Sequence, residues 1–196
     1  MPISLIVLAA GLGTRMNSDR PKVLHQLAAA PLLHHALNAG RSVDPSRIIV
    51  VAGQDSAAVA KSAALFDESV EVVVQDPQLG TAHAVAAAAS LLTGATGDAI
   101  VLYGDTPFIR PETLQAMIEA RETHAIVVLG FTAADPGRYG RLIVIGNQLD
   151  RIVEFKDATA AERAVTLCNS GAVCAEIGRP VAGEYGVPTR AQSRRI

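Results

Sequence analysis

Four short stretches of the chain carry the glycine and polar residues that could do chemistry. They are AAGLGTR at residues 9–15, QDPQLGTAHA at 75–84, YGDTP at 103–107 and GRYGR at 137–141. In the first stretch, small side chains let a ligand approach the backbone, whose N–H groups can surround phosphate oxygens. Arg15 and Lys22 add positive charge there. These residue types predict a site for a phosphorylated ligand.

The first stretch differs from the two best-known glycine-rich phosphate loops. Met16 stands where a dinucleotide-binding motif needs a third small residue, and the Gly-Lys-Ser/Thr of a P-loop is missing. Gly11 and Gly13 alone are equally typical of an ordinary turn after a strand. The two nearby cations make phosphate binding the favoured interpretation.

The next two stretches add a candidate metal ligand and polar contacts. Asp105 directly follows an apolar run, where a carboxylate either closes a turn or binds Mg²⁺ together with substrate phosphates. Thr81 would cap a helix or hold a ligand, and Gln75 could hydrogen-bond the edge of a base. Phosphate binding beside a metal ligand predicts nucleotide chemistry.

Apolar runs that alternate with helical segments must position these stretches. The spacing predicts strands at 3–8, 47–52, 70–74, 99–103 and 125–131, and helices at 29–39, 56–65, 81–92 and 111–123. Such alternation is typical of an α/β fold with a three-layer, Rossmann-like, mostly parallel sheet and helices on both faces. All four stretches then follow the carboxyl ends of strands, where open parallel sheets bind ligands.

The pattern changes after about residue 138. The segment RLIVIGNQLDRIVEF at 141–155 predicts a hairpin that turns at Gly146 and Asn147. Glu154, close to Lys156, is compatible with a surface ion pair, and Asn169 with a buried turn amide. We expect one domain over 1–177 and an irregular tail over 178–196.

Composition excludes several classes of protein. A net charge of −2 without a long basic run argues against a nucleic-acid partner, and no apolar stretch is long enough for a membrane span. Neither the two cysteines, Cys168 and Cys174, nor the five histidines have the spacing of a metal site. We therefore expect a cytoplasmic protein.

Taken in order along residues 3–173, several motifs resemble one family. They are LAAGLGTRM, PKVLH, QLGTAHA, LYGDTP, GRYGR, IVEFKDA and NSG. The set resembles the uridylyltransferase (pyrophosphorylase) domain of bacterial N-acetylglucosamine-1-phosphate uridyltransferases, within the nucleotide-diphospho-sugar transferase superfamily. The resemblance implies transfer of a uridylyl group from UTP to N-acetylglucosamine 1-phosphate with Mg²⁺. The products would be pyrophosphate and UDP-N-acetylglucosamine, a precursor of peptidoglycan and lipopolysaccharide in cell wall biogenesis.

The resemblance also implies roles for individual residues. Arg15 and Lys22 would be catalytic, and Asp105 would bind the metal. The nucleotide would be held by Leu8, Ala9, Ala10, Gly11, Gly13, Gln75, Gly80 and Thr81. The sugar would be held by Tyr103, Gly104, Gly140, Glu154 and Asn169.

The resemblance ends before the family's second metal ligand and before its acetyltransferase β-helix. We therefore expect weakened uridylyl transfer, no acetyl transfer and no trimer formed by a β-helix. Two alternatives stay open. One is a nucleotidyltransferase with another base or acceptor, and the other is a catalytically silent domain that binds a nucleotide or a sugar phosphate.

Overall fold

The computed structural model of the chain describes residues 1–11, 16, 18–54, 56–146 and 148–178. These residues divide into two compact units. The first unit comprises residues 1–127 and 172–178, and the second unit comprises residues 128–171. The expected tail over 178–196 lies outside the described residues apart from Gly178.

A mostly parallel sheet forms the centre of the first unit, as predicted. Its strand order is β5 (Glu71–Val74), β4 (Arg47–Ala52), β1 (Ile3–Ala9), β6 (Asp98–Tyr103) and the second half of β10 (Leu167–Glu176). The first four strands run parallel, and β10 runs antiparallel to β6. Because β1 is central, every residue of this strand is buried.

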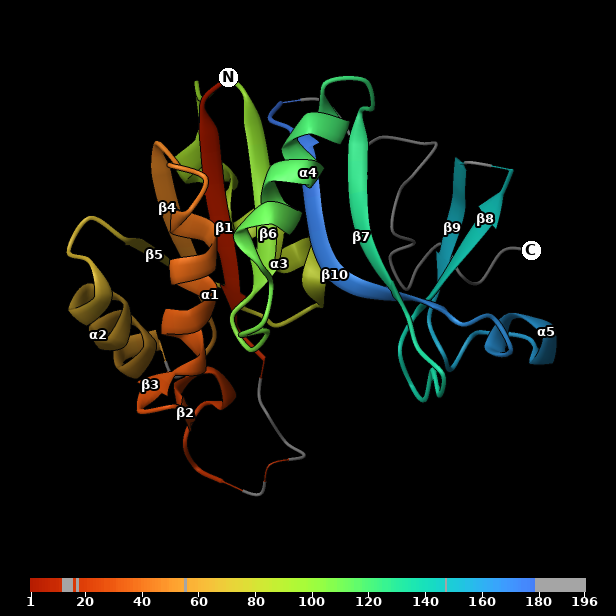
Figure 1. The fold of residues 1–196 in the computed structure, drawn as a ribbon. Helices are drawn as coiled ribbons and strands as arrows, with labels where there is room; N and C mark the ends of the chain where they lie inside the picture. The colour runs from red at the N-terminus through yellow and green to blue at the C-terminus, as the bar shows by residue number, and fades with distance from the viewer. Residues whose placement is uncertain (12–15, 17, 55, 147, 179–196) are drawn as a thin grey trace. The chain divides into compact units, whose positions relative to one another are not determined.

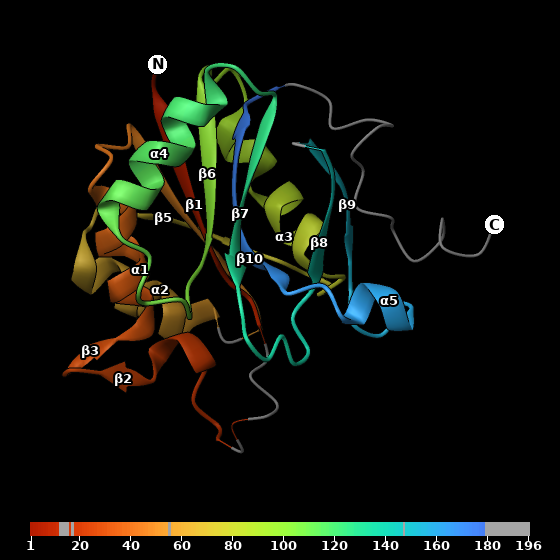
Figure 2. The ribbon, with the colours of Figure 1, turned by 45° about the vertical axis from the view of Figure 1, so that its right-hand side comes forward.

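Helices cover both faces of this sheet, which confirms the three-layer prediction. In Figures 1 and 2, α1 (Leu32–Arg41) and α4 (Pro111–Arg121) lie on one face, and α3 (Thr81–Ala87) lies on the other. Helix α2 (Ser56–Phe66) contacts α1, the edge strand β5 and its neighbour β4. The core on the α3 side is aliphatic and consists of Ile6, Leu8, Ile49, Val51, Ala84, Ala88 and Val101.

The prediction of a helix over 29–39 is wrong at both ends. Residues Ala30–Pro31 form β3, which pairs with β2 (Gln26–Leu27) across a turn in which Ala28 and Ala29 have positive φ. The helix also continues past Gly40 to Arg41. A Cβ at Gly40 would come within 2.3 Å of Leu5 Cδ2, so this glycine allows close helix–sheet packing and does not stop the helix.

Two other helices are shorter than predicted. The segment 81–92 divides into α3 and the 3₁₀ helix η3 (Ala88–Leu92), and α4 ends at Arg121, two residues before the predicted end. Helix α4 begins at Pro111, in agreement with the prediction. A further 3₁₀ helix, η2 (Lys22–Leu24), follows the glycine-rich stretch.

The second unit is built on antiparallel pairing. Strands β8 (Arg141–Ile145) and β9 (Gln148–Val153) form the predicted hairpin. The first half of β10 pairs with β8, and β7 (Ile126–Thr132) also pairs with β10. The sequence patterns predicted neither β10 nor the short helix α5 (Ala160–Arg163), which is labelled in Figure 2.

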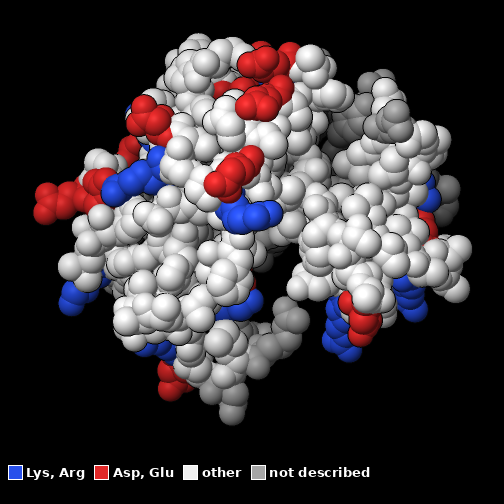
Figure 3. Space-filling model, viewed as in Figure 1, with Lys and Arg blue, Asp and Glu red and all other residues white. Residues whose placement is uncertain are grey.

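The charged side chains of the described residues are dispersed on the face shown in Figure 3, where the basic groups form no continuous patch. Within the described part of the chain, no helix has the length and apolar composition needed to cross a membrane. Cys168 and Cys174 are both buried free thiols.

Candidate active site

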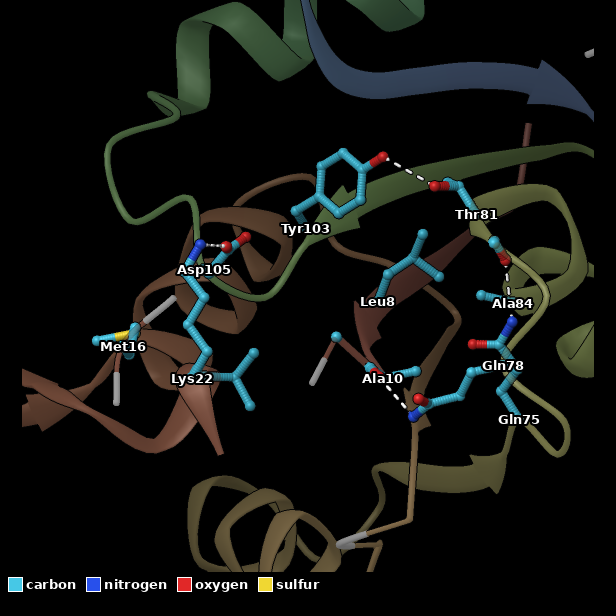
Figure 4. Close-up of a pocket in the computed structure, with 13 residues that line it drawn as sticks. Leu8, Ala10, Met16, Lys22, Gln75, Gln78, Thr81, Ala84, Tyr103 and Asp105 are labelled. Atoms are coloured by element: carbon cyan, nitrogen blue, oxygen red, sulfur yellow. Dashed lines mark hydrogen bonds and ion pairs between the residues drawn. The ribbon is translucent and has the colours of Figure 1, made fainter. Parts of the chain in front are cut away.

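A cavity of about 480 Å³ lies in the first unit beyond the carboxyl ends of β1, β5 and β6 (Figure 4). Three of the four stretches singled out in the sequence meet there. The lining residues are Leu8, Ala10, Gly11, Met16, Lys22, Val23, Gln75, Gln78, Gly80, Thr81, Ala84, Tyr103 and Asp105. The structure thus brings together nine of the residues that were assigned to nucleotide, sugar, phosphate and metal.

Gln75 lines the cavity and also holds the loop that follows β5. Its side chain is buried, and its Nε2 donates a hydrogen bond to the Gly80 carbonyl at 2.9 Å. The same nitrogen lies 3.2 Å from Nδ1 of His83. The amide nitrogen of Gln75 thus binds groups of the protein itself, and its hydrogen bond to the Gly80 carbonyl holds Gly80 at the start of α3.

Thr81 and Tyr103 join two elements of the cavity wall. The N-cap of α3 is Gly80, so the interpretation of Thr81 as a helix cap is wrong. Its hydroxyl instead lies 3.2 Å from the Tyr103 hydroxyl, at the end of β6. Thr81 therefore presents a hydroxyl to the cavity with a protein partner on one side.

Gln78 is a cavity residue that the sequence patterns did not single out. Its Nε2 donates to the Ala10 carbonyl at 2.7 Å, which ties the loop after β5 to the loop after β1. Gly53 leaves room for this bridge, since a Cβ there would lie 2.1 Å from Gln78 Nε2 and 2.9 Å from the Ala10 oxygen. The only signal in the sequence was its place within QLGTAHA.

Lys22 and Asp105 form an ion pair on the opposite side of the cavity from Gln75, Gln78 and Thr81 (Figure 4). Both side chains remain partly exposed, at 37% for Lys22 and 24% for Asp105. The predicted phosphate-binding cation and the predicted metal ligand therefore stand side by side. The described residues contain no group of three or more carboxylates, histidines or cysteines that could hold a metal. A single carboxylate fits an ion that brings phosphate oxygens as its other ligands.

Four further residues, assigned to the nucleotide (Ala9 and Gly13), to the sugar (Gly104) and to catalysis (Arg15), are not among the described residues that line the cavity. Ala9 is buried at the end of β1, paired with Ala52. Gly104 donates its N–H to the Leu8 carbonyl at 2.9 Å, where it packs against β1. Gly13 and Arg15 lie outside the described residues.

The other three residues assigned to the sugar lie together in the second unit. The Gly140 carbonyl accepts a hydrogen bond from the Asn169 N–H at 2.9 Å, and a Cβ on Gly140 would lie 3.4 Å from Glu154 Oε1. We call Glu154, Gly140 and Asn169 the acceptor row. Because the central residue has no side chain, the carboxylate and the amide flank the partly exposed backbone of Gly140.

The two side chains of the acceptor row have different partners. Asn169 Oδ1 accepts the Gly171 N–H at 2.9 Å, and the side-chain amide nitrogen of Asn169 is a further hydrogen-bond donor. The ion pair considered between Glu154 and Lys156 is wrong, since Lys156 Nζ lies 3.9 Å from Asp157. The fourth stretch, GRYGR, contributes Gly140 to the acceptor row of the second unit and no residue to the cavity of the first unit.

Both the fold and the sequence are similar to those of known proteins. UDP-glucose pyrophosphorylase complexed with UDP-glucose shares the fold with a TM-score of 0.73 and 18% identity, over 89% of this chain and 76% of that one. HddC from Yersinia pseudotuberculosis complexed with GMP-PN gives a TM-score of 0.71 at 24% identity, over 88% and 76%.

Relatives named "Bifunctional protein GlmU" are much closer in sequence. The protein from Cereibacter sphaeroides strain ATCC 17023 is 69% identical over 176 residues, which cover 90% of this chain and 39% of that protein. The protein from Paracoccus denitrificans is 51% identical over 94% of this chain and 43% of that protein. The chain thus spans about two fifths of these relatives. The model of the MobA-like NTP transferase domain matches residues 5–171. The chain therefore belongs to the MobA-like NTP transferase domain family.

Proposed function

We propose that the chain transfers the uridylyl group of UTP to N-acetylglucosamine 1-phosphate and releases pyrophosphate. The observation that carries this proposal is a single cavity with an ion pair on one side and polar loop residues on the other. The motifs that resemble uridylyltransferases contribute these residues, and relatives named "Bifunctional protein GlmU" share most of the chain at high identity.

The nucleotide would occupy the cavity of the first unit. Its volume of about 480 Å³ lies in the range of pockets that bind small molecules and cofactors. The base and ribose would lie against Leu8, Ala10 and Gly11, and the loop fixed by Gln75 would provide polar contacts through Gly80 and Thr81. The triphosphate would extend to Lys22, with Arg15 as a second cation.

The acceptor sugar would bind at the acceptor row of the second unit. The Glu154 carboxylate can accept hydrogen bonds from sugar hydroxyls, and the Asn169 amide nitrogen can donate to the acetamido carbonyl. Gly140 keeps the space between them open. Tyr103 and Gly104, which the resemblance also assigns to the sugar, belong to the first unit.

The reaction needs alignment and charge stabilisation more than proton transfer. A phosphate monoester with a second pKa of about 6 is largely ionised near neutral pH, so its oxygen can attack the α-phosphorus without a general base. Lys22 would stabilise the negative charge that develops on the phosphates as pyrophosphate leaves. Mg²⁺, which Asp105 would hold, would supply further neutralisation of the phosphates. The chain's own task is to hold the two substrates in line.

The proposal is tested by incubating the purified chain with UTP, N-acetylglucosamine 1-phosphate and Mg²⁺ and measuring pyrophosphate. We expect release that depends on both substrates and that falls sharply in Lys22→Ala. The matched control is Lys61→Ala, which removes an exposed lysine of α2 away from the cavity-lining residues.

The same assay separates the alternatives. Equal release with CTP or GTP would refute the uridine assignment, and release with another sugar phosphate alone would change the acceptor. Retained UTP binding without release above Lys22→Ala would leave a silent nucleotide-binding domain. Since UTP is an intracellular metabolite and both cysteines are free thiols, we propose that the chain works in the cytoplasm.

A further inference from the structure

Arg141 is a buried cation that has no carboxylate partner within the described part of the chain. Its side chain is almost completely enclosed, at 2% exposure for the residue, and it forms no ion pair with any carboxylate of the described residues. Burial of a lone charge is costly unless hydrogen bonds replace its water. The position of Arg141 therefore requires an explanation from its polar contacts.

Backbone carbonyl groups take the place of water around this guanidinium. Nη1 donates to the Pro136 carbonyl at 3.4 Å and to the Tyr139 carbonyl, and Nη2 donates to the Gly137 carbonyl at 3.0 Å. Nε and Nη2 both donate to the carbonyl of Arg163, at 3.4 and 3.2 Å. The planar fork of arginine can reach four carbonyl groups at once, which a lysine ammonium on a single stem cannot do.

The four carbonyl groups come from two segments beside the acceptor row. Residues 136–139 are the loop that leads into Gly140, and Arg163 is the last residue of α5. The α5 end is in turn attached to the chain after Glu154, because Arg163 Nε donates to the Phe155 carbonyl at 3.2 Å. The guanidinium carbons of Arg141 and Arg163 also lie 5.9 and 4.7 Å from the centroid of the Phe155 ring.

The strand register places Arg141 directly behind the acceptor row. Arg141 on β8 is paired with Val153 on β9 and with Cys168 on β10. Gly140 precedes Arg141 in the chain, whereas Glu154 follows Val153 and Asn169 follows Cys168. Because the pairing is antiparallel, these three residues lie side by side and form the acceptor row. Side chains point to alternate faces along a strand. The Arg141 side chain therefore lies on the opposite face from the side chains of Glu154 and Asn169.

We infer that Arg141 is a positioning residue for acceptor binding. By binding the loop before Gly140 and the end of α5, it holds the Glu154 carboxylate and the Asn169 amide at a fixed separation around Gly140. This inference rests on the proposed function, because the acceptor row is a sugar site only within that proposal. Arg141 itself touches neither substrate.

The test compares Arg141→Lys with Arg151→Lys. Arg151 lies on β9 of the same unit, is 51% exposed in its side chain and pairs with Asp150 and Glu162, so its variant controls for the loss of an arginine. We expect Arg141→Lys to raise the KM for N-acetylglucosamine 1-phosphate about tenfold or more. The Kd for UTP should remain within about twofold of the wild type, because the nucleotide cavity is in the other unit. Arg151→Lys should change neither value.

Two measurements keep the inference testable if Arg141→Lys folds poorly. In the variant, hydrogen exchange should accelerate at the Asn169 amide, which donates to Gly140, and stay slow at β1 amides. In the wild type loaded with a non-hydrolysable UTP analogue, the Arg141 Nε–H resonance should shift when the acceptor is added. It should not shift when the analogue alone binds.

The outcomes distinguish this inference from the proposed function. Failure of the wild type to bind or use the acceptor would overturn both. Acceptor use by the wild type, with an unchanged acceptor KM and unchanged Asn169 exchange in Arg141→Lys, would overturn the role of Arg141 alone. An equal loss of UTP and acceptor affinity would also overturn it, because the effect would then be general destabilisation.

Discussion

The two units hold their polar residues by different physical means. In the first unit, Gln78 and Asp105 stand in loops beyond the ends of parallel strands and Lys22 begins η2, and the side chains of these residues line a cavity. In the second unit, Gly140 and Asn169 are joined backbone to backbone across antiparallel strands. Separations in the first unit therefore depend on side-chain rotamers, and those in the second unit depend on strand register.

This difference suggests a division of tasks. Rotatable side chains such as Lys22 can exchange partners as a charged ligand arrives and leaves. A row fixed by register changes little, which suits recognition of a sugar by hydrogen bonds at set distances. The following substitutions test whether the contrast holds, beginning with the largest expected effect.

Asp105→Asn should abolish most of the turnover while keeping the cavity's shape. Loss of the negative charge removes the proposed metal ligand, and we expect kcat to fall by about 100-fold or more. Pyrophosphate release over a range of Mg²⁺ concentrations measures the effect. Glu68→Gln, an exposed carboxamide substitution in the same unit, is the control. Turnover at the wild-type level would show that the charge of Asp105 is dispensable.

Gly53→Ala tests whether the first unit also contains one rigid contact. The added Cβ would meet the Gln78 nitrogen and the Ala10 carbonyl, so we expect the bridge between the two loops to break. The free energy of unfolding should fall by about 1–3 kcal/mol as measured by chemical denaturation. Calorimetry should show weaker UTP binding. Unchanged stability and affinity would mean that Gln78 moves aside freely.

Gly140→Ala is the matched substitution in the second unit. Its Cβ would lie 3.4 Å from Glu154 Oε1 and 3.7 Å from Asn169 Cβ, which are ordinary van der Waals contacts, so folding should tolerate it. By narrowing the acceptor row, it should raise the acceptor KM about threefold to tenfold with little change in UTP affinity. An altered UTP Kd with a normal acceptor KM would contradict the separate roles of the two units.

Glu162→Gln should have the smallest effect, and one that depends on pH. Hydrogen bonds from the Thr159 backbone, from Arg151 and from the Thr159 hydroxyl lower the pKa of Glu162 from 4.5 to about 2. The ionised carboxylate therefore stabilises the folded chain above pH 4.5, and this contribution is lost as the pH falls towards 2. Thermal unfolding of wild type and variant should differ slightly at pH 6 and converge near pH 2. A difference in unfolding temperature that persists at pH 2 would show that the negative charge of Glu162 is not the source of the stabilisation.

The sequence predicted the first unit better than the second, for a physical reason. Residues 47–52 form β4 with the predicted bounds, because a strand buried on both faces is continuously apolar. The loops that follow such strands share one edge of the sheet, so the meeting of Gly11, Thr81 and Asp105 could be foreseen. The Gln78 bridge could not, since it depends on the path of a loop.

Strand β10 and the acceptor row were harder to foresee from local pattern. The strand contains Asn169 and Gly171, which are typical of turns, and pairing with β6 and β8 overrides that preference. The resemblance assigned Gly140, Glu154 and Asn169 to the sugar but did not explain their proximity. That proximity follows from the register of β8 with its two neighbours, which the composition of each strand leaves open.

The ion pair of Lys22 with Asp105 means that the cavity contains its own pair of counterions. A free triphosphate that draws Lys22 away would leave the Asp105 carboxylate unmatched, and a lone divalent cation on Asp105 would leave the Lys22 ammonium unmatched. A metal–nucleotide complex replaces both charges in one event. The cavity should therefore select the complex over either component, and the salt dependence of its binding should be weaker than that of an unpaired lysine.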